Sequence, residues 1–544
     1  TRFMNELYER ISFLMNSGDP SEKLRGLNAI VQLIDVQLGE NTMRIPRFAN
    51  YLRDIFQPSA SDEIMRAASA TLGHLARVGG ALTAEVVELE VKRALEWLQI
   101  ERVEARRYAA VLILKELADN APTVFNVHVP SFIACIWAAL RDPSVKVREA
   151  AVSALQACLC VVEKRETRFR VQWYYRMFEE SQLGLGKNAS TESIHGSLLT
   201  VGELLRYTGE FMLARYRDVV ETVLAYRDHK DKLIRRSVTQ LIPRVAHFSP
   251  QRFARDYLSS SLAHLQGVMR SAGPERGLGF RALSDVAVAV GDKLQPHLGG
   301  IVSLLHEAIS NKKRSFCPEA LVCIGSLAKA VDQAMSEHCQ RLLPDMFNGG
   351  LSNELVGALS DLAATMPNLL PSIRQRLLDL LSLVLVRRSL TSGAQLNGYS
   401  LAFTNEMNSS DLTRLALKTL GTFDLDAAVL LEFLRDSVLV YLDDDEAPTR
   451  QAAAVCCCSI IEKSKANRKD GWRRLAMVEE IMNKLLAVAV SDVHPGVRQT
   501  VLEAFKASIA FDDHLSQAQS LRALFLLLND EQFAVKKTAI KLCG

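Results

Sequence analysis

The chain has 544 residues, with 65 Lys or Arg against 62 Asp or Glu, so its formal net charge is only +3. A charge this close to zero argues against a dedicated nucleic-acid binder, which usually carries a strong basic excess. The ten cysteines are scattered along the chain without the spacing of a zinc site or a disulfide framework, which favours a reducing, intracellular compartment.

Residues 1–40 predict a first helical hairpin. Apolar side chains recur at helical spacing on both sides of a short polar turn. In that turn Asp19 precedes Pro20, and this pair is typical of a helix start because Asp accepts the free N–H groups of the first turn while Pro suits the first helical position. Residues 41–80 and 82–121 predict two further units of the same kind.

The clearest copy of this turn lies at residues 141–151. Asp142 and Pro143 again mark a helix start, and Val147, Ala151 and Leu155 begin an apolar stripe. A second stripe, which includes Phe132, ends just before the turn. Two amphipathic helices joined by a short turn cannot bury their apolar faces alone, so neighbouring hairpins must stack.

An acidic residue followed by a basic residue six positions later returns along the chain. The pairs are Asp19 and Arg25, Asp142 and Arg148, Asp444 and Arg450, Asp492 and Arg498, and Asp530 and Lys536. Weaker copies carry only the basic residue, at Arg66, Arg106 and Arg235. We expect these pairs to form a structural ladder of bonds between stacked units rather than a catalytic site.

The spacing of these marks predicts the fold class. A period of roughly 40–47 residues with two helices per unit is the signature of HEAT or armadillo repeats. We therefore predict an all-α, HEAT/armadillo-type α-solenoid of about twelve to thirteen helical hairpins, wound into a curved superhelix.

Two stretches interrupt the regular succession of helical hairpins. Residues 164–193 are expected to be irregular, and residues 389–410 are expected to form a long loop or sub-domain boundary. The predicted organisation is a solenoid over residues 1–388, the break at 389–410, and continuing repeats over 411–544. Since the chain opens on Thr1 and stops at Gly544 inside a second helix, we expect it to be a fragment.

No catalytic or ligand-binding motif is found. The eleven His show no metal-ligand pairing, and the zincin, α/β-hydrolase, dinucleotide and protein-kinase signatures are missing. We therefore predict no catalytic, cofactor-binding or metal-binding residues and no cofactor, and we expect His128, His195 and His247 to be packed or capping side chains. No apolar run approaches the ~18 residues that span a membrane, so no transmembrane segment is expected.

Nine stretches of the chain together carry a family resemblance. In chain order they are Arg47-Phe48-Ala49-Asn50-Tyr51-Leu52-Arg53, residues 88–98, residues 106–118, Gln172-Trp173-Tyr174, Phe178-Glu179-Glu180, residues 194–199, residues 381–385, residues 416–421 and residues 514–518. They resemble the N-terminal HEAT region of the target of rapamycin (TOR) kinases. The resemblance covers nearly the whole chain.

The resemblance implies a non-catalytic scaffold. TOR proteins carry serine/threonine kinase activity in a C-terminal domain, which nothing in these 544 residues matches. In growth and nutrient signalling, the implied partner is a Raptor-type adaptor in TOR complex 1, together with TOR complex 2 subunits and a Rheb-type small GTPase. The resemblance further implies homodimers of the full-length protein and a cytoplasmic location with peripheral association with vacuole or lysosome membranes.

Three other HEAT-repeat classes remain open from the residues alone. A nuclear transport receptor would bind basic signals on an acidic face, which the near-neutral charge disfavours. A phosphatase scaffold has stricter spacing and shorter turns, which the break at 389–410 disfavours. A nucleic-acid-binding HEAT protein would bind DNA in a salt-dependent way, which a gel shift at low salt would reveal; we expect no nucleic-acid partner.

Overall fold

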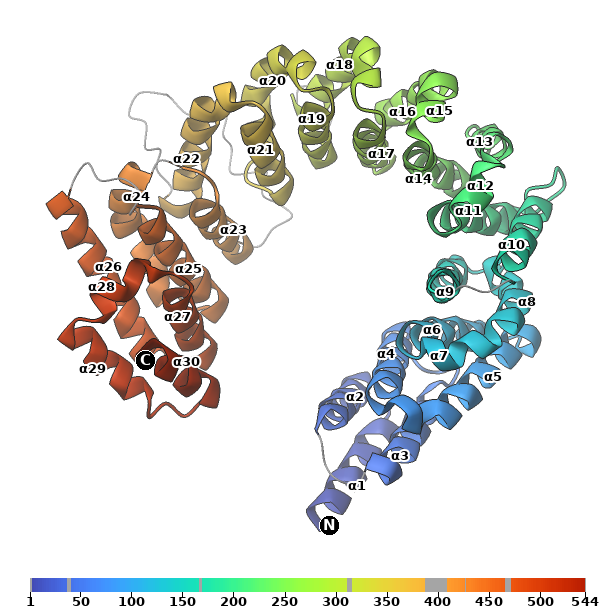
Figure 1. Cartoon of the computed structure of the whole chain (residues 1–544), viewed down its shortest axis with the longest axis horizontal. Coiled ribbons are helices and arrows are strands. Elements are labelled where there is room, and N and C mark those ends of the chain that lie inside the picture. Colours follow the sequence, from blue (N-terminus) through green and yellow to red (C-terminus); the bar gives the residue numbers. More distant parts are fainter. Residues whose placement is uncertain are drawn as a thin grey trace. The chain divides into compact units, whose positions relative to one another are not determined.

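A computed structural model describes residues 2–36, 41–165, 169–310, 316–386, 409–425, 427–464 and 471–543. The regular elements in these ranges are helices (Figure 1). The predicted all-α solenoid is confirmed. Of the predicted break at 389–410, residues 389–408 lie outside the described residues, and Ser409 and Ser410 begin helix α23.

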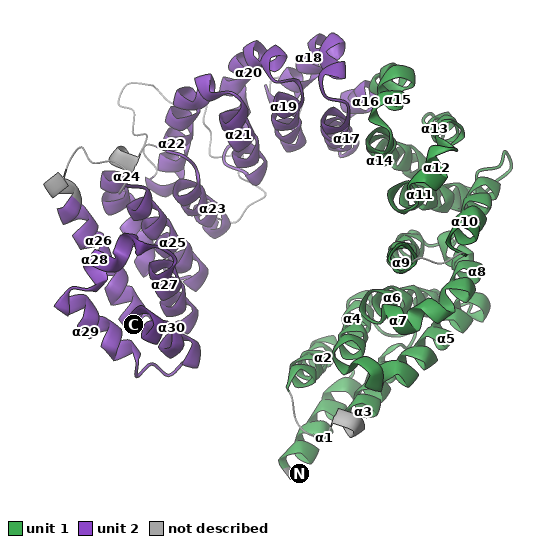
Figure 2. Ribbon diagram, in the orientation of Figure 1, with its two compact units in different colours: residues 1–264 green, residues 265–544 purple. Residues whose placement is uncertain are grey.

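The described chain forms two compact units, residues 1–264 and residues 265–544 (Figure 2). Unit 1 contains α1 (Arg2–Asn16), α2 (Pro20–Asp35), α3 (Asn41–Ile55), α4 (Asp62–Gly79), α5 (Ala84–Ile100), α6 (Glu104–Asn120), α7 (Pro122–Phe125), α8 (Val129–Leu140), α9 (Val145–Glu163), α10 (Arg170–Gly184), α11 (Thr191–Tyr207), α12 (Glu210–Leu213), α13 (Tyr216–Ala225), α14 (Lys232–Phe248) and α15 (Pro250–Asp256). Helix α16 (Leu258–Arg270) runs across the division between the units.

Unit 2 continues the alternation of first and second helices. It contains α17 (Glu275–Val290), α18 (Leu298–Ile309), α19 (Pro318–Val331), α20 (Gln333–Met346), α21 (Asn353–Thr365), α22 (Leu370–Val386), α23 (Ser409–Thr422), α24 (Ala427–Phe433), α25 (Ala447–Ser464), α26 (Gly471–Ser491), α27 (Pro495–Ala507), α28 (Asp512–Leu515), α29 (Ala518–Leu527) and α30 (Phe533–Cys543). Short 3₁₀ turns join several of these helices, and a single π-helical turn (Leu434–Val438) follows α24.

Polar side chains start the second helices of the hairpins. Asp19 accepts a hydrogen bond from the Ser21 N–H at 2.9 Å, and Pro20 takes the first position of α2. Ser61 caps α4 and Ser190 caps α11, while Asp231 accepts from two N–H groups of α14. These caps satisfy donors that a helix leaves free in its first turn, so each helix begins where the sequence places an Asp or Ser.

The second helices form the core of each unit by packing against one another. In unit 1 they run α2, α4, α6, α9, α11 and α14, each in contact with the next. Helix α6 shows why this works, because Ala109, Ala110 and Leu114 are fully buried and the two alanines let neighbouring helices approach closely. In unit 2, α17, α19 and α21 stack in the same way, as do α23, α25, α27 and α30.

The cysteines of α25 behave as core residues. Cys456, Cys457 and Cys458 are buried between the neighbouring helices. Burial raises the pKa of Cys456 to about 12, since a thiolate would lose its hydration there. These thiols are therefore packing groups rather than nucleophiles.

Two sequence predictions about elements are corrected. Residues 170–184 form helix α10 inside the stretch expected to be irregular, because Tyr174, Met177, Ser181 and Gly184 fall on one buried face at helical spacing. In addition, no apolar run of the length that spans a membrane was expected, but Pro122–Leu140 is long and apolar enough to cross a membrane by length and composition. Half of that stretch is buried in the protein, and it is divided among α7, a 3₁₀ turn and α8, so it reads as a core segment of the repeat.

Candidate functional site

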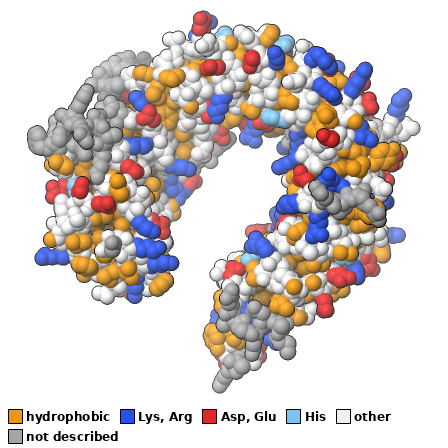
Figure 3. All heavy atoms as spheres, in the orientation of Figure 1, with side chains coloured by type: hydrophobic (Ala, Val, Ile, Leu, Met, Phe, Trp, Pro, Cys, Tyr) orange, Lys and Arg blue, Asp and Glu red, His pale blue; other side chains and the backbone are white. Residues whose placement is uncertain are grey.

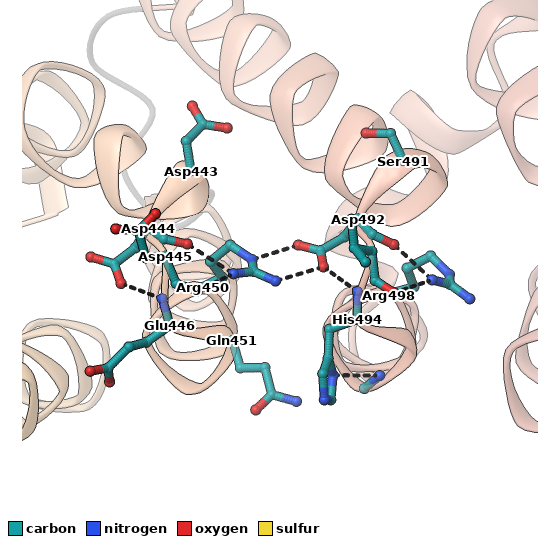
Figure 4. A network of polar contacts seen from close by, with 12 residues as sticks. Asp443, Asp444, Asp445, Glu446, Arg450, Gln451, Ser491, Asp492, His494 and Arg498 are labelled. Carbon is teal, nitrogen blue, oxygen red and sulfur yellow. Dashed lines mark hydrogen bonds and ion pairs between the residues drawn. The ribbon is translucent and has the colours of Figure 1, made fainter.

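The predicted ladder residues of unit 2 join three successive second helices. Figure 4 shows the first of these contacts, between Arg450 and Asp492, and the local contacts of Arg498. Arg450 of α25 donates from Nε to Asp492 Oδ2 at 2.7 Å and from Nη2 to Asp492 Oδ1 at 2.9 Å. Arg498 of α27 repeats this with Asp530, at 2.7 and 2.9 Å. Each contact is a two-pronged guanidinium–carboxylate pair, which is the strongest geometry for this type of ion pair.

The spacing of six residues has a local cause. The carboxylate of Asp492 accepts the N–H of His494 at 2.8 Å, which shapes the turn before α27. Arg498, in the second turn of that helix, then donates from Nη1 to the Asp492 carbonyl at 2.7 Å. Asp444 and Arg450 make the same two local contacts. Each Asp–Arg pair therefore closes its own turn and leaves the remaining donors of the Arg for the next repeat.

The charges of this ladder stabilise one another. The hydrogen bond that Arg450 donates to Asp492 raises the pKa of Arg450, and the one that Arg498 donates to Asp530 raises the pKa of Arg498. Burial pushes the pKa of Asp492 upward, but the hydrogen bonds from Arg450 and the backbone of His494 outweigh it, and the net shift is downward. The pKa of Asp530 is likewise lowered, chiefly by Arg498. Both carboxylates are held in their charged form.

Unit 1 has a corresponding ladder with a different acceptor at its end. Arg107 of α6 donates to both carboxylate oxygens of Asp142, at 2.6 and 3.2 Å. Arg148 of α9 is only 3% exposed and donates to the carbonyls of its own turn, including Pro143 at 3.0 Å. Its Nε, however, donates to Nδ1 of His195 in α11 at 3.0 Å. An imidazole here takes the place that carboxylates fill in unit 2.

A glycine allows His195 to reach Arg148. A Cβ at Gly196 would lie 1.7 Å from the carbonyl oxygen of Leu140, so only glycine lets α11 approach the end of α8 this closely. Burial lowers the pKa of His195 to about 4, and the neighbouring Arg148 adds to the effect while Asp231 opposes it. The ring is therefore neutral near pH 7 and accepts at Nδ1, which places its proton on Nε2.

Of the remaining predicted ladder residues, Arg25 and Lys536 do not join repeats, whereas Arg66 reaches the next second helix without pairing with a carboxylate. Asp19 caps α2, but Arg25 is exposed and makes no ion pair within the described residues. The side chain of Lys536 likewise makes no hydrogen bond or ion pair in the described part of α30 or its neighbours. Arg66 of α4 donates to the Tyr108 hydroxyl at 3.2 Å.

The sequence pattern chose Arg106 where its neighbour Arg107 makes the inter-repeat contact, and it missed His229 as the partner of Arg235. Arg106 pairs with Glu101 of its own turn, and its neighbour Arg107 makes the contact to the next repeat. His229 accepts the Asp231 N–H at 3.1 Å and offers its carbonyl to Arg235 at 2.8 Å, as the ladder Asp residues do. Glu101 lies six residues before Arg107, and His229 lies six residues before Arg235, so a search that accepted Glu or His would have found them.

The described residues offer no metal centre. Among them, no group of three or more His, Cys, Asp or Glu is placed to hold a metal ion. The polar clusters that do form are the ladder pairs and local helix caps, which tie helices together. What the arrangement supplies is a stacked helical surface with fixed repeat-to-repeat geometry.

Comparison with known proteins decides the family. No family model matches the chain. It is 47% identical over its whole length to the serine/threonine-protein kinase TOR of Arabidopsis thaliana, 49% to that of Oryza sativa, and 35% to tor1 of Schizosaccharomyces pombe. The chain belongs to the TOR kinase family. It spans 22–24% of the length of these relatives, although all of it is matched.

The resemblance found from the sequence is thereby confirmed. The aligned part is the N-terminal region of the TOR kinases, so the kinase domain of those proteins lies outside it. The described residues form stacked helices, and the matched region does not include the kinase domain.

Solved structures support the fold alone. The karyopherin Kap121p bound to the SUMO protease Ulp1p matches with a TM-score of 0.54 at 12% identity, covering 98% of this chain and 61% of that chain. Kap121p bound to Ste12p matches similarly, with a TM-score of 0.53. At such low identity the likeness shows a shared helical-repeat architecture only, and it does not indicate a shared function.

Proposed function

We propose that this chain is a non-catalytic scaffold region of a TOR kinase that docks a Raptor-type adaptor in TOR complex 1. The observation that carries the proposal is the match of the whole chain to TOR kinases of which it spans less than a quarter. A region of this size without a kinase domain contributes to a kinase by holding other proteins, and nutrient and growth signalling is the setting we propose for it.

The architecture supports a docking role. Stacked hairpins expose long helical ridges that suit large protein partners. First helices of unit 1 carry exposed apolar side chains, among them Leu89 of α5, Tyr175 of α10 and Leu183 of α10, the last 72% exposed. Figure 3 shows hydrophobic side chains interspersed with both signs of charge on the face it presents. Mixed surfaces of this kind are typical of interfaces that form between separately folded proteins.

The proposal extends to the wider assembly. We propose contacts with TOR complex 2 subunits and with a Rheb-type small GTPase, and homodimers of the full-length kinase. We also propose a cytoplasmic location with peripheral association with vacuole or lysosome membranes. These expectations rest on the family relation, and each requires its own binding or localisation measurement.

Co-elution of the purified chain with a Raptor-type adaptor tests the central proposal. We expect a stable complex by size-exclusion chromatography, weakened by Leu183→Asp on the exposed face of α10. Lys541→Glu on α30 in unit 2 is the matched surface control. Absence of co-elution by a chain that is helical by circular dichroism would contradict docking by this region.

Equal loss from both variants would contradict a docking face on α10. In that case adaptor binding would depend on surface properties common to the two units, and the α10 assignment would be abandoned. Loss from Lys541→Glu alone would place the contact in unit 2 instead.

A further inference from the structure

A hollow of about 570 Å³ lies in unit 1 between the C-terminal ends of α11 and α14. Figure 1 shows these helices side by side, and they pack directly against each other. The residues that line the hollow are Leu205, Arg206, Gly209, Arg244, His247 and Phe248. Its volume is within the range of about 300–1,000 Å³ that is usual for small-molecule sites.

The lining is basic. Arg206, Arg244 and His247 are all exposed, and no acidic residue is among the lining residues. Glu203 lies beneath them, almost fully buried, and offsets one of the positive charges. The lining that the structure describes carries two guanidinium groups and an imidazole and no carboxylate, and after Glu203 offsets Arg244 the charge of Arg206 remains, which favours an anion.

Both guanidinium groups are held in place from outside the hollow. Arg244 donates from Nη1 to Glu203 Oε1 at 2.7 Å. The guanidinium of Arg206 lies over the Tyr207 ring, 5.3 Å from its centre, and the Tyr207 hydroxyl accepts from Gln156 of α9 at 3.1 Å. Because these contacts restrict the two side chains, less conformational entropy is lost when they bind a ligand.

Gly202 makes the arrangement possible. A Cβ there would lie 2.6 Å from Leu241 Cδ2 and 2.7 Å from Arg244 Nη1. Glycine therefore lets the side chain of Arg244 lie directly across α11, where it reaches Glu203. The position of this cation depends on the close packing of the two helices.

We propose that this hollow binds a small phosphate ester. A guanidinium fork matches phosphate oxygens in two parallel hydrogen bonds. Arg206 supplies such a fork with a charge that is unpaired within the described residues, Arg244 spends Nη1 on Glu203 and keeps its other donors, and His247 adds a ring nitrogen to the same lining. Leu205 and Phe248 supply an apolar wall in the same hollow, which suits the organic part of an ester better than a bare ion. The site does not depend on the adaptor-docking proposal, since it concerns a small ligand within unit 1.

Calorimetric titration of the 544-residue chain tests the site, with phenyl phosphate, inorganic phosphate and benzyl alcohol as probes at fixed ionic strength. We expect phenyl phosphate to bind more tightly than inorganic phosphate, and benzyl alcohol to show no measurable binding. Arg206→Gln should lower the affinity for phenyl phosphate by about tenfold or more, because it removes one charge-assisted pair of hydrogen bonds. Arg244 is left intact, since its loss would strand the buried Glu203.

The matched control is Arg236→Gln, an exposed arginine of α14 that does not line the hollow. We expect it to change the affinity for phenyl phosphate by less than about twofold. Equal losses from Arg206→Gln and Arg236→Gln would overturn the proposal, since they would indicate non-specific attraction to positive charge. Binding of a phosphorylated peptide without binding of phenyl phosphate would also overturn it, because the occupant would then be a protein partner.

Discussion

The two units build the same ladder with different acceptors. In unit 2, Arg450 and Arg498 each meet a carboxylate, so both of these inter-repeat pairs are electrically neutral. In unit 1, Arg107 meets Asp142, but the next arginine, Arg148, meets the imidazole of His195. The comparison teaches that the repeat requires an acceptor at this place, while the charge of that acceptor can change.

The substitution of an imidazole has an electrostatic cost. Burial lowers the pKa of Arg148, and among the described residues no carboxylate forms a close pair with it, although Glu192 and Asp142 act on it from farther away. In unit 2 the hydrogen bonds that Arg450 and Arg498 donate to Asp492 and Asp530 raise the pKa of these arginines. We therefore expect the unit 2 ladder to be the stronger of the two and the unit 1 ladder to respond to mild acid.

The largest effect is expected from Asp492→Ala in unit 2. It removes both hydrogen bonds from Arg450 and the cap on the His494 N–H, so the free energy of local opening of α25 and α27 should fall by about 3 kcal/mol. Hydrogen exchange of the amides in these helices measures this, because repeats open locally. The control Asp445→Ala, at an exposed neighbour in the same unit, should change protection by less than about 0.5 kcal/mol. Equal losses would show that the ladder contact contributes nothing.

A smaller effect is expected from His195→Leu in unit 1. It leaves Arg148 Nε without its acceptor but keeps the contacts of Arg148 to its own turn, so the opening free energy of α9 and α11 should fall by about 1–2 kcal/mol. His195→Asn places an amide oxygen near the position of Nδ1 and should recover at least half of that loss. If the Leu and Asn variants lose the same protection, the hydrogen bond is not what stabilises this contact.

The two ladders should differ in their stability at mildly acidic pH. His195 has a pKa of about 4 in the folded chain against an ordinary value of 6.5, so its contribution is complete above pH 6.5 and is lost as the pH falls toward 4. The pKa values of Asp492 and Asp530 are below the ordinary 3.8, so their contributions are complete above that pH and are lost only at lower pH. At pH 5, α9 and α11 should therefore lose protection, by about 1–2 kcal/mol, while α25 and α27 keep theirs.

His195→Asn provides the control for that measurement. The variant has no titrating group at this position, so its α9 and α11 amides should show little change between pH 7 and pH 5 once intrinsic exchange rates are corrected. Persistence of the full acid effect in this variant would assign it to another group, such as the half-buried His264, whose pKa is also lowered by desolvation.

The smallest effects are expected at the two ends of the sequence pattern. Arg25→Ala and Lys536→Ala remove residues that match the ladder spacing but make no ion pair within the described residues. Each should change protection of its own helix by less than about 0.5 kcal/mol. A loss above about 1 kcal/mol in this chain would show that the sequence spacing alone marks a stabilising contact.

The amino-acid sequence by itself determined the helical hairpins and those ladder contacts that each Asp–Arg pair makes within its own turn. Apolar periodicity places the second helices, and an Asp six residues before an Arg closes its own turn through the Asp carboxylate and carbonyl. These interactions lie within one short segment, so the spacing is visible in the sequence. The same logic could have identified Glu101 and His229, which lie at the ladder spacing with a different acceptor.

Only the tertiary structure decided what each arginine meets in the next repeat. Arg107 rather than Arg106 reaches Asp142, and Arg148 reaches a histidine 47 residues away because Gly196 lets α11 approach α8. The same holds for the basic hollow, where Glu203 of α11 orients Arg244 of α14. Such contacts depend on the rotation and separation of stacked helices, which the packing of many side chains sets together and which no single segment encodes.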